Sequence, residues 1–339
     1  MSAAIHVEHL SKTYVEGILR RKKRQALKNV SFTVQPGEIF GLLGGNGAGK
    51  TTFIKILLGI IRRSEGLAML LGFPAGDRRA RKRVGYLPEN LRVPRHLTAI
   101  TALEYYGHLS NVPSHIIRSR RGPLLERVGL APRAKDPVRN YSKGMLQRLG
   151  LAQAMLHDPD IFILDEPTDG LDPIARSQVR GYLAELKQQG KTVFLNSHIL
   201  QEVELICDRV AILAQGVLKE VAPVKELTAR KSASLLNEVD VHLDLVGEET
   251  AIRDSLQRQA VPPAAVTNWQ AVADPQVAGA TPVKAHSFRF NVKLPDQLGV
   301  DSLVDELRRR QVSIVGLTRP RMSLEQAYLE IVAAEVIEK

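Results

Sequence analysis

The amino-acid sequence predicts an α/β fold for residues 1 to about 222, followed by a small α+β domain over residues 223–339. In the first part, short runs that are apolar on both faces alternate with helical stretches, which is typical of a buried and largely parallel sheet. In the second part, polar and apolar residues alternate strictly, which is typical of strands with one face in water. A glycine-rich turn between a strand and a helix is a further indication of an α/β unit.

The clearest strands of the first part are Glu38 to Leu43, Thr192 to Leu195 and Val210 to Leu213. Between about residues 90 and 155 the pattern changes to helices that are separated by prolines. Because proline interrupts the hydrogen-bond ladder of a helix, these are expected to be several short helices. We therefore expect a helical subdomain at about 90–155, inserted between two halves of the sheet.

The expected elements of the C-terminal domain are strands at 237–246 and 287–294 and helices at 300–310 and 323–337. The last helix opens with a capping box from Ser323 to Gln326, a pattern in which side chains bond the free backbone N–H groups of a helix start. The Pro- and Ala-rich segment from Val261 to Pro282 predicts a loop, and Pro223 to Ser232 a linker.

The composition is that of an ordinary soluble globular protein, with 44% hydrophobic and 24% charged residues. No run reaches the roughly 18 apolar residues that a membrane span needs, and the N-terminus lacks a signal-peptide pattern. The single cysteine, Cys207, excludes an internal disulfide framework and a multi-cysteine zinc site. We therefore expect the chain to stay in the cytoplasm.

The formal net charge of +11 comes from basic residues that cluster at 20–24, 78–83 and 118–121. Such clusters are typical of a solvated surface. They also suit contact with anionic lipid on the inner leaflet, worth about 1 kcal/mol per basic residue. Nucleic acid is a third possibility, although only 5% of the residues are aromatic and the clusters hold none that could stack on bases. Composition alone does not decide among the three, and it is the motifs described next that lead us to expect no nucleic-acid partner.

The apolar run that ends at Leu43 leads directly into Gly44-Gly45-Asn46-Gly47-Ala48-Gly49-Lys50-Thr51. A helix is predicted from about Thr51 to Leu58, so the pattern G-x-x-x-x-G-K-[ST] stands in the strand–loop–helix context that it requires. Glycines let backbone N–H groups turn inward around phosphate oxygens, and the helix start adds partial positive charge. This context disfavours a chance glycine turn. We expect Lys50 to reach the β- and γ-phosphates of a nucleotide, and the Thr51 hydroxyl to ligate Mg²⁺.

A second apolar run, Ile161 to Leu164, ends at the acidic pair Asp165-Glu166. Phosphoryl transfer needs a held metal ion and a positioned water. We expect Asp165 to face the metal and Glu166 to act on the attacking water as base or orienter. The alternative, in which two acids simply start a helix, is disfavoured downstream of the glycine loop.

Five ordered motifs resemble those of the ATP-binding cassette (ABC) ATPases. Besides the glycine loop they are Tyr141–Met145, Asp165-Glu166, Gly170–Pro173 and Ser197-His198. The resemblance covers about residues 4–222 and implies a P-loop NTPase fold of ABC type that uses ATP and Mg²⁺. It also implies a head-to-tail cassette dimer, formed with a second copy or with another cassette. Each ATP would lie between the glycine loop of one cassette and the signature segment (Tyr141–Met145) of the other.

The resemblance also implies roles for single residues. Tyr14 would stack on adenine, a contact worth on the order of 1–3 kcal/mol. In trans, Ser142 and Gly144 would touch the γ-phosphate, and Asp172 would lie at the dimer seam. The whole ATP-binding set is Tyr14, Gly44, Gly45, Asn46, Gly47, Ala48, Gly49, Lys50, Thr51, Thr52, Ser142, Gly144 and Asp172.

Catalysis and metal binding are assigned in the same way. Lys50, Glu166 and His198 would be the catalytic residues, with His198 hydrogen-bonded to the γ-phosphate. The Mg²⁺ ligands would be Thr51, Asp165 and Glu89.

The sequence departs from the family pattern at three places. Gly45 stands where proline is common, a small change because only the backbone is used there. Glu89 replaces the usual glutamine near metal and water, which adds negative charge and leaves its coupling role open. Lys143 and Met145 replace a glycine and a glutamine of the signature segment. The Lys143 ammonium either adds a cation near the triphosphate or faces solvent.

These departures and the segment Ser323–Glu330 resemble one branch of the family, the separate ATPase subunits of bacterial multidrug, antibiotic and polysaccharide exporters. The resemblance implies an exporter ATPase that drives a separately encoded transmembrane permease at the cytoplasmic face of the cell membrane. A groove for the permease is expected between Glu89 and the helical subdomain. Its candidates, which are equally compatible with plain core, are Leu91, Val93, His96, Tyr105 and Tyr106.

The alternative is a soluble ABC ATPase that acts on nucleic acid or ribosomes. Chromosome-type members carry long coiled coils between the loop and the signature, where this chain has only about 90 residues. Repair-type members need zinc cysteines, and translation-type members hold two cassettes. The C-terminal domain is expected to contact the dimer or the permease rather than sense a small molecule, because His242 and His286 are lone histidines.

Overall fold

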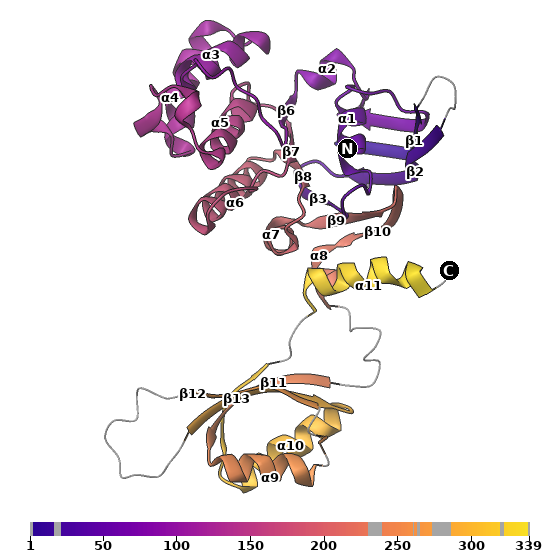
Figure 1. Ribbon diagram of the computed structural model, residues 1–339, viewed down its shortest axis with the longest axis vertical. Helices are drawn as coiled ribbons and strands as arrows, with labels where there is room; N and C mark the ends of the chain where they lie inside the picture. Colours follow the sequence, from indigo (N-terminus) through magenta and orange to yellow (C-terminus); the bar gives the residue numbers. More distant parts are fainter. Residues whose placement is uncertain are drawn as a thin grey trace. The chain divides into compact units, whose positions relative to one another are not determined.

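The computed structural model describes residues 3–16, 22–229, 239–259, 261–262, 265–272, 286–318 and 322–337. The chain divides into two compact units, Met1–Leu227 with Ser323–Lys339, and Thr228–Met322 (Figure 1). The expected accessory domain instead ran from 223 to the C-terminus. The difference arises because the last helix, α11 (Leu324–Ile337), packs against α7 (Leu200–Ile206) and β10 (Val217–Pro223) of the first unit.

The first unit is built on a sheet of ten strands in the order β5-β4-β1-β2-β10-β9-β3-β8-β7-β6. Its strands are β1 Ile5–Glu16, β2 Lys22–Val34, β3 Ile39–Leu43, β4 Glu65–Leu70, β5 Phe73–Pro74, β6 Val84–Leu87, β7 Ile161–Asp165, β8 Thr192–Asn196, β9 Arg209–Ala214 and β10 Val217–Pro223. Neighbouring pairs from β9 through β3, β8 and β7 to β6 are parallel, which confirms the predicted α/β class. The antiparallel pairing of β1 with β2 and with β4 was not predicted, because it depends on which segments near the start of the chain become neighbours.

The helices of the first unit are α1 Lys50–Leu57, α2 Arg78–Arg81, α3 Ala99–Leu109, α4 Ser114–Arg127, α5 Lys143–Met155, α6 Pro173–Gln188, α7 and α11. Helix α8 (Val224–Ala229) begins in this unit and ends just past its boundary at Leu227. Helices α3, α4 and α5 occupy the segment expected to be a helical subdomain, and they lie together in Figure 1. No helix among the described residues is long and apolar enough to cross a membrane.

A stack of buried phenylalanines fixes helix α1 to the sheet. The Phe53 ring of α1 lies 5.2 Å from that of Phe32 and 5.6 Å from that of Phe194. Phe40 in β3 lies 5.3 Å from Phe32 and 6.0 Å from Phe194. Since aromatic pairs at these separations add stability beyond the area they bury, the stack holds the helix start in place over the end of β3.

The second unit comprises β11 Val239–Gly247, α9 Glu249–Arg258, β12 Val266–Val272, β13 His286–Leu294, α10 Gln297–Arg309 and β14 Ser313–Thr318. The strand order β12-β13-β11-β14, with all neighbours antiparallel, and the chain order β-α-β-β-α-β are those of the ferredoxin-like, or split βαβ, arrangement. The expected loop at 261–282 was wrong where β12 forms, and its residues 273–282 lie outside the described residues. The Trp269 ring of β12 stacks 4.6 Å from Phe290, a tertiary contact that overrides the Pro- and Ala-rich composition.

Of the expected linker at 223–232, residues 224–229 form α8 and 230–232 lie outside the described part of the chain.

Candidate functional site

The loop between β3 and α1 depends on its glycines. A Cβ added to Gly44 would lie 2.5 Å from the backbone oxygen of Leu213 and 2.9 Å from the Ala48 Cβ. Gly49 has φ +108°, and a Cβ there would lie 2.6 Å from the backbone oxygen of Ala26. Only glycine fits both positions without strain. The two glycines therefore allow the loop to pack closely against the backbone of Leu213 and Ala26.

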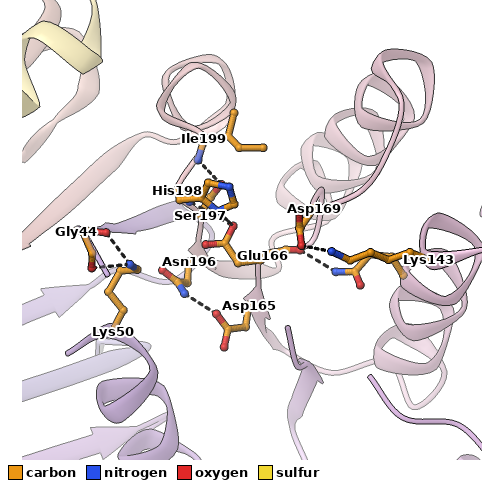
Figure 2. Close-up of polar contacts among 12 residues, drawn as sticks. Gly44, Lys50, Lys143, Asp165, Glu166, Asp169, Asn196, Ser197, His198 and Ile199 are labelled. Carbon is orange, nitrogen blue, oxygen red and sulfur yellow. Dashed lines mark hydrogen bonds and ion pairs between the residues drawn. The ribbon is translucent and has the colours of Figure 1, made fainter. Parts of the chain in front are cut away.

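Lys50 begins α1 and folds back over this loop. Its Nζ donates to the backbone oxygen of Gly44 at 2.6 Å and to that of Gly45 at 3.2 Å (Figure 2). Burial lowers the pKa of the Lys50 ammonium, while Glu166, Asp165 and Glu89 act in the opposite direction. The ammonium is therefore the positive centre of a site that is otherwise rich in carboxylates.

Asp165 ends β7, and Asn196 ends the neighbouring strand β8 in register with it. The Asn196 amide nitrogen donates to Asp165 Oδ1. Asp165 is only 2% exposed, and burial raises the pKa of its carboxyl group above the ordinary value. The other amide atom, Asn196 Oδ1, is buried and has no hydrogen-bond partner among the residues that the structure describes.

Glu166 is held in a strained backbone conformation beside this pair. Its φ is +54°, in the left-handed region that a non-glycine residue adopts at a cost on the order of 1–3 kcal/mol. The Glu166 backbone N–H donates to the backbone oxygen of Asn196 at 2.9 Å. The side-chain amide of Gln147 in α5 donates to the backbone oxygen of Glu166 at 2.8 Å. Residues held in this way cluster at functional sites, because the strain aims a side chain.

The Glu166 carboxylate meets His198 in the loop between β8 and α7. Glu166 Oε2 lies 2.8 Å from His198 Nδ1 and accepts the His198 backbone N–H at 3.2 Å (Figure 2). Burial raises the pKa of the Glu166 carboxyl, and the His198 contacts partly oppose that rise. The pair resembles a base with its orienting partner.

Lys50, Glu166, Asn196 and His198 line one pocket of about 640 Å³. Of the residues expected at the site, those that line it are Tyr14, Gly44, Gly45, Asn46, Gly47, Ala48, Gly49, Lys50, Thr51, Thr52, Glu89, Glu166 and His198. The residues that sequence reasoning did not assign to the site are Arg24, Ala26, Asp169, Asn196, Ser197, Leu200 and Tyr328. The position of Asn196 and Ser197 just before His198 was a signal for those two, whereas Tyr328 stood out only as part of the segment Ser323–Glu330, with no link to the nucleotide site.

Tyr14 lies at one end of the glycine loop. Its hydroxyl is 3.4 Å from the Thr52 hydroxyl, and the Lys12 ammonium lies 5.0 Å from the centre of its ring. The Tyr14 ring therefore lines the pocket beside Thr52 in helix α1 rather than beside Gly44 at the start of the loop.

Ser142, Gly144 and Asp172 are not among the pocket-lining residues of their own chain. The Ser142 hydroxyl caps α5 by accepting the Met145 N–H at 3.2 Å, and Asp172 caps α6 by accepting the Ala175 N–H at 2.8 Å. Both side chains thus have a structural role at a helix start.

The Lys143 side chain, for which two roles were left open, contacts an acidic residue of its own chain. Its ammonium forms an ion pair with Asp169, and its side chain remains 62% exposed (Figure 2). The side chain is therefore partly solvated and is neutralised within its own chain.

The expected metal ligands are only partly gathered. Glu89 and Thr51 line the pocket, while Asp165 bonds Asn196 at its base. Among the described residues, no group of three or more His, Cys, Asp or Glu side chains could hold a metal ion by itself. A hydroxyl and a carboxylate suit Mg²⁺, which takes few protein ligands and completes its shell with water and phosphate oxygens.

A parallel sheet whose strand runs into a glycine cradle, with Lys50 in the cradle and acidic side chains at neighbouring strand ends, defines a P-loop nucleotide-binding protein. The family model described as "ABC transporter" matches residues 27–169. The Bacillus subtilis ABC transporter ATP-binding protein YxlF is 32% identical over 330 residues, which cover 97% of this chain and 100% of that protein. The chain belongs to the family of ABC transporter ATP-binding proteins.

Two further relatives and one solved structure agree with this assignment. An uncharacterized ABC transporter ATP-binding protein of Synechocystis sp. is 53% identical over 211 residues, 62% of this chain and 60% of that protein. The Nod factor export ATP-binding protein I of Ralstonia nicotianae is 40% identical over 205 residues, 60% of this chain and 64% of that protein. The similarity therefore spans less than two thirds of either relative. A solved ATP-binding subunit of an ABC transporter has a TM-score of 0.59 and 30% identity, covering 66% of this chain and 91% of that one.

Proposed function

We propose that this chain binds and hydrolyses ATP as the ATPase subunit of an ABC transporter, and drives a separately encoded transmembrane permease. One observation carries the proposal: a glycine cradle with Lys50 and a strained, buried Glu166 held by His198 line the same pocket. Binding and hydrolysis of a nucleoside triphosphate need these two groups side by side.

The loop binds the phosphates and Tyr14 binds the base. Backbone N–H groups of residues 45–49 and the start of α1 favour phosphate oxygens, and Lys50 exchanges its loop carbonyls for the β- and γ-phosphates. The Tyr14 ring stacks on adenine at the far end of the loop. This orientation leaves the γ-phosphate toward Glu166 and His198.

Glu166 orients or deprotonates the attacking water, because its carboxylate is desolvated and fixed by its backbone. His198 holds that carboxylate through Nδ1 and faces the pocket, where its other ring nitrogen serves the γ-phosphate. Thr51, Asp165 and Glu89 would hold Mg²⁺, which would neutralise charge on the phosphate oxygens.

The pH dependence of hydrolysis tests the Glu166–His198 pair. Burial raises the pKa of Glu166 and His198 lowers it, and only the carboxylate can act on water. The rate should therefore fall as pH drops through the Glu166 pKa. His198→Gln removes the contacts that lower the pKa of Glu166, so this pKa should rise. The acid limb of the kcat profile should then move to higher pH, even if the maximal kcat also changes.

The control for this experiment is His115→Gln, which replaces an exposed histidine of α4. Its profile should overlay that of the unmodified chain. An acid limb that stays in place or moves to lower pH in His198→Gln would contradict the assigned pair.

We infer that a second cassette completes the site. Ser142, Gly144 and Asp172 do not line the pocket of their own chain. They nevertheless match the positions at which the family contacts nucleotide. In a head-to-tail dimer of two copies, or of this chain with another cassette, these residues face the partner's ATP. Nucleotide binding then closes the pair and hydrolysis reopens it.

The transported cargo moves outward in this proposal, and the chain works at the cytoplasmic face of the cell membrane through its permease. The relative named for Nod factor export supports this direction. Tyr105, 48% exposed, is suited to a permease contact next to Tyr106, whereas Val93 is buried and belongs to the core. The basic clusters at 78–83 and 118–121 are suited to contact with anionic lipid of the inner leaflet.

Copurification tests the function directly. The tagged chain, extracted with its membranes in mild detergent, should bring down a multi-span membrane protein, and the complex should hydrolyse ATP. Copurification with ribosomes or DNA and no membrane protein would contradict the transport role.

A further inference from the structure

The last helix belongs to the nucleotide-binding unit, although the chain reaches it only after the second unit. The Leu324 N–H at the start of α11 donates to the Glu204 carboxylate of α7 at 2.8 Å. Leu324 is fully buried and Ala327 is 3% exposed. Ser323 and Gln326 cap the same turn by reciprocal hydrogen bonds of 2.9 and 3.2 Å. These contacts fix the position and rotation of α11.

This rotation directs Tyr328 to the nucleotide pocket, where it is one of the lining residues. The Tyr328 hydroxyl oxygen lies 3.8 Å from the position that a Gly45 Cβ would occupy, so it approaches the second residue of the glycine loop. A Cβ at Gly45 would make only an ordinary van der Waals contact with this hydroxyl, so the approach of Tyr328 to the loop does not depend on the glycine.

The position along the loop identifies the part of the nucleotide that Tyr328 faces. The Gly45 oxygen accepts from Lys50 Nζ at 3.2 Å, so the Tyr328 hydroxyl lies near the loop residue that holds the ammonium. Tyr14 lies instead beside Thr52. Because a P-loop lysine reaches the β- and γ-phosphates, the two tyrosines face opposite ends of the nucleotide, Tyr14 the base and Tyr328 the terminal phosphate.

The Tyr328 hydroxyl has no hydrogen-bond partner among the residues that the structure describes. A Tyr hydroxyl that is fully buried usually has such a partner, whereas one that lines a pocket is available to donate to a bound ligand. A phosphate oxygen is a strong acceptor, and hydrogen bonds to ionised groups are shorter and stronger than neutral ones.

We propose that Tyr328 is a specificity residue for the triphosphate, whose hydroxyl donates to the terminal phosphate of ATP, a hydrogen bond that ADP cannot make. The proposal rests on the proposed ATP site. Glu204 is the positioning residue, because its carboxylate anchors the helix start four residues before Tyr328.

The test is calorimetric titration of the purified full chain with Mg²⁺ and either ADP or the non-hydrolysable ATP analogue AMP-PNP. Tyr328→Phe keeps the ring and removes only the hydroxyl. It should weaken AMP-PNP binding by about tenfold, the size expected for one hydrogen bond to a charged group, and change ADP affinity by less than about twofold. Glu204→Gln should shift AMP-PNP affinity in the same direction by a smaller factor, since an amide oxygen still accepts the Leu324 N–H.

The matched control is Leu329→Ala, at the next residue of the same helix, where the side chain is 57% exposed. It should bind both nucleotides as the unmodified chain does. Equal AMP-PNP affinity in Tyr328→Phe and the unmodified chain would overturn the proposal, as would equal losses for AMP-PNP and ADP.

Lys50→Ala in the same titration separates this proposal from the proposed function. If Lys50→Ala abolishes binding while Tyr328→Phe changes nothing, the ATP site stands and only the role of Tyr328 falls. If Lys50→Ala binds both nucleotides normally, the ATP site itself is refuted.

Discussion

Lys50→Ala is expected to lower the affinity of the chain for ATP by at least about a hundredfold. The ammonium would lose two charge-assisted contacts to phosphate, each worth about 1.5–3 kcal/mol, and tenfold in affinity corresponds to about 1.4 kcal/mol. The substitution also removes the hydrogen bonds of 2.6 and 3.2 Å to the oxygens of Gly44 and Gly45, so the empty loop loses its brace. Equilibrium binding of a fluorescent ATP analogue measures the effect.

Lys55→Ala is the matched control, because Lys55 is an exposed cation on the same helix. It should retain the affinity of the unmodified chain, which separates a local effect of Lys50 from a general loss of positive charge. A Lys50→Ala chain that binds ATP normally would show that the glycine loop is not the phosphate site.

Glu166→Gln should keep ATP binding and slow hydrolysis by about 10²–10⁴-fold, the usual contribution of a positioned general base. The amide is nearly isosteric and still offers an oxygen to the His198 N–H, now 3.2 Å from Glu166 Oε2. It cannot accept a proton from water. Phosphate release under saturating ATP measures the rate, and the same fluorescent analogue measures binding.

The trapped nucleotide should also hold two cassettes together, so Glu166→Gln with ATP is expected to elute from a sizing column as a dimer. Glu126→Gln, which neutralises an exposed carboxylate of α4, should turn over ATP at the unmodified rate and elute accordingly. Parent-level hydrolysis in Glu166→Gln would remove Glu166 from the catalytic role.

Local pattern was enough where the structure is local. The turn from β3 into α1 could be predicted because only glycine tolerates the close approach of Leu213 to Gly44 and the positive φ of Gly49. The alternation around Phe288 and Phe290 likewise predicted β13. In both cases neighbouring residues in the chain decide the backbone.

Contacts between distant segments could not be predicted in the same way. The amide of Gln147 reaches the Glu166 backbone across 19 positions, and Asn196 meets Asp165 only because β8 lies beside β7. The strand β12 forms where composition favours a loop, because Trp269 finds Phe290. Each of these depends on which elements become neighbours.

By itself the sequence determined that a glycine loop joins a buried strand to a helix, and that an acidic pair ends a second buried strand. Their spacing constrains the backbone directly, whatever the rest of the chain does. Only the tertiary structure decided that α11 returns to the nucleotide-binding unit and brings Tyr328 to Gly45. The physical reason is that this contact joins residues 283 positions apart, a difference of 328 and 45, through packing on α7 that no local pattern encodes.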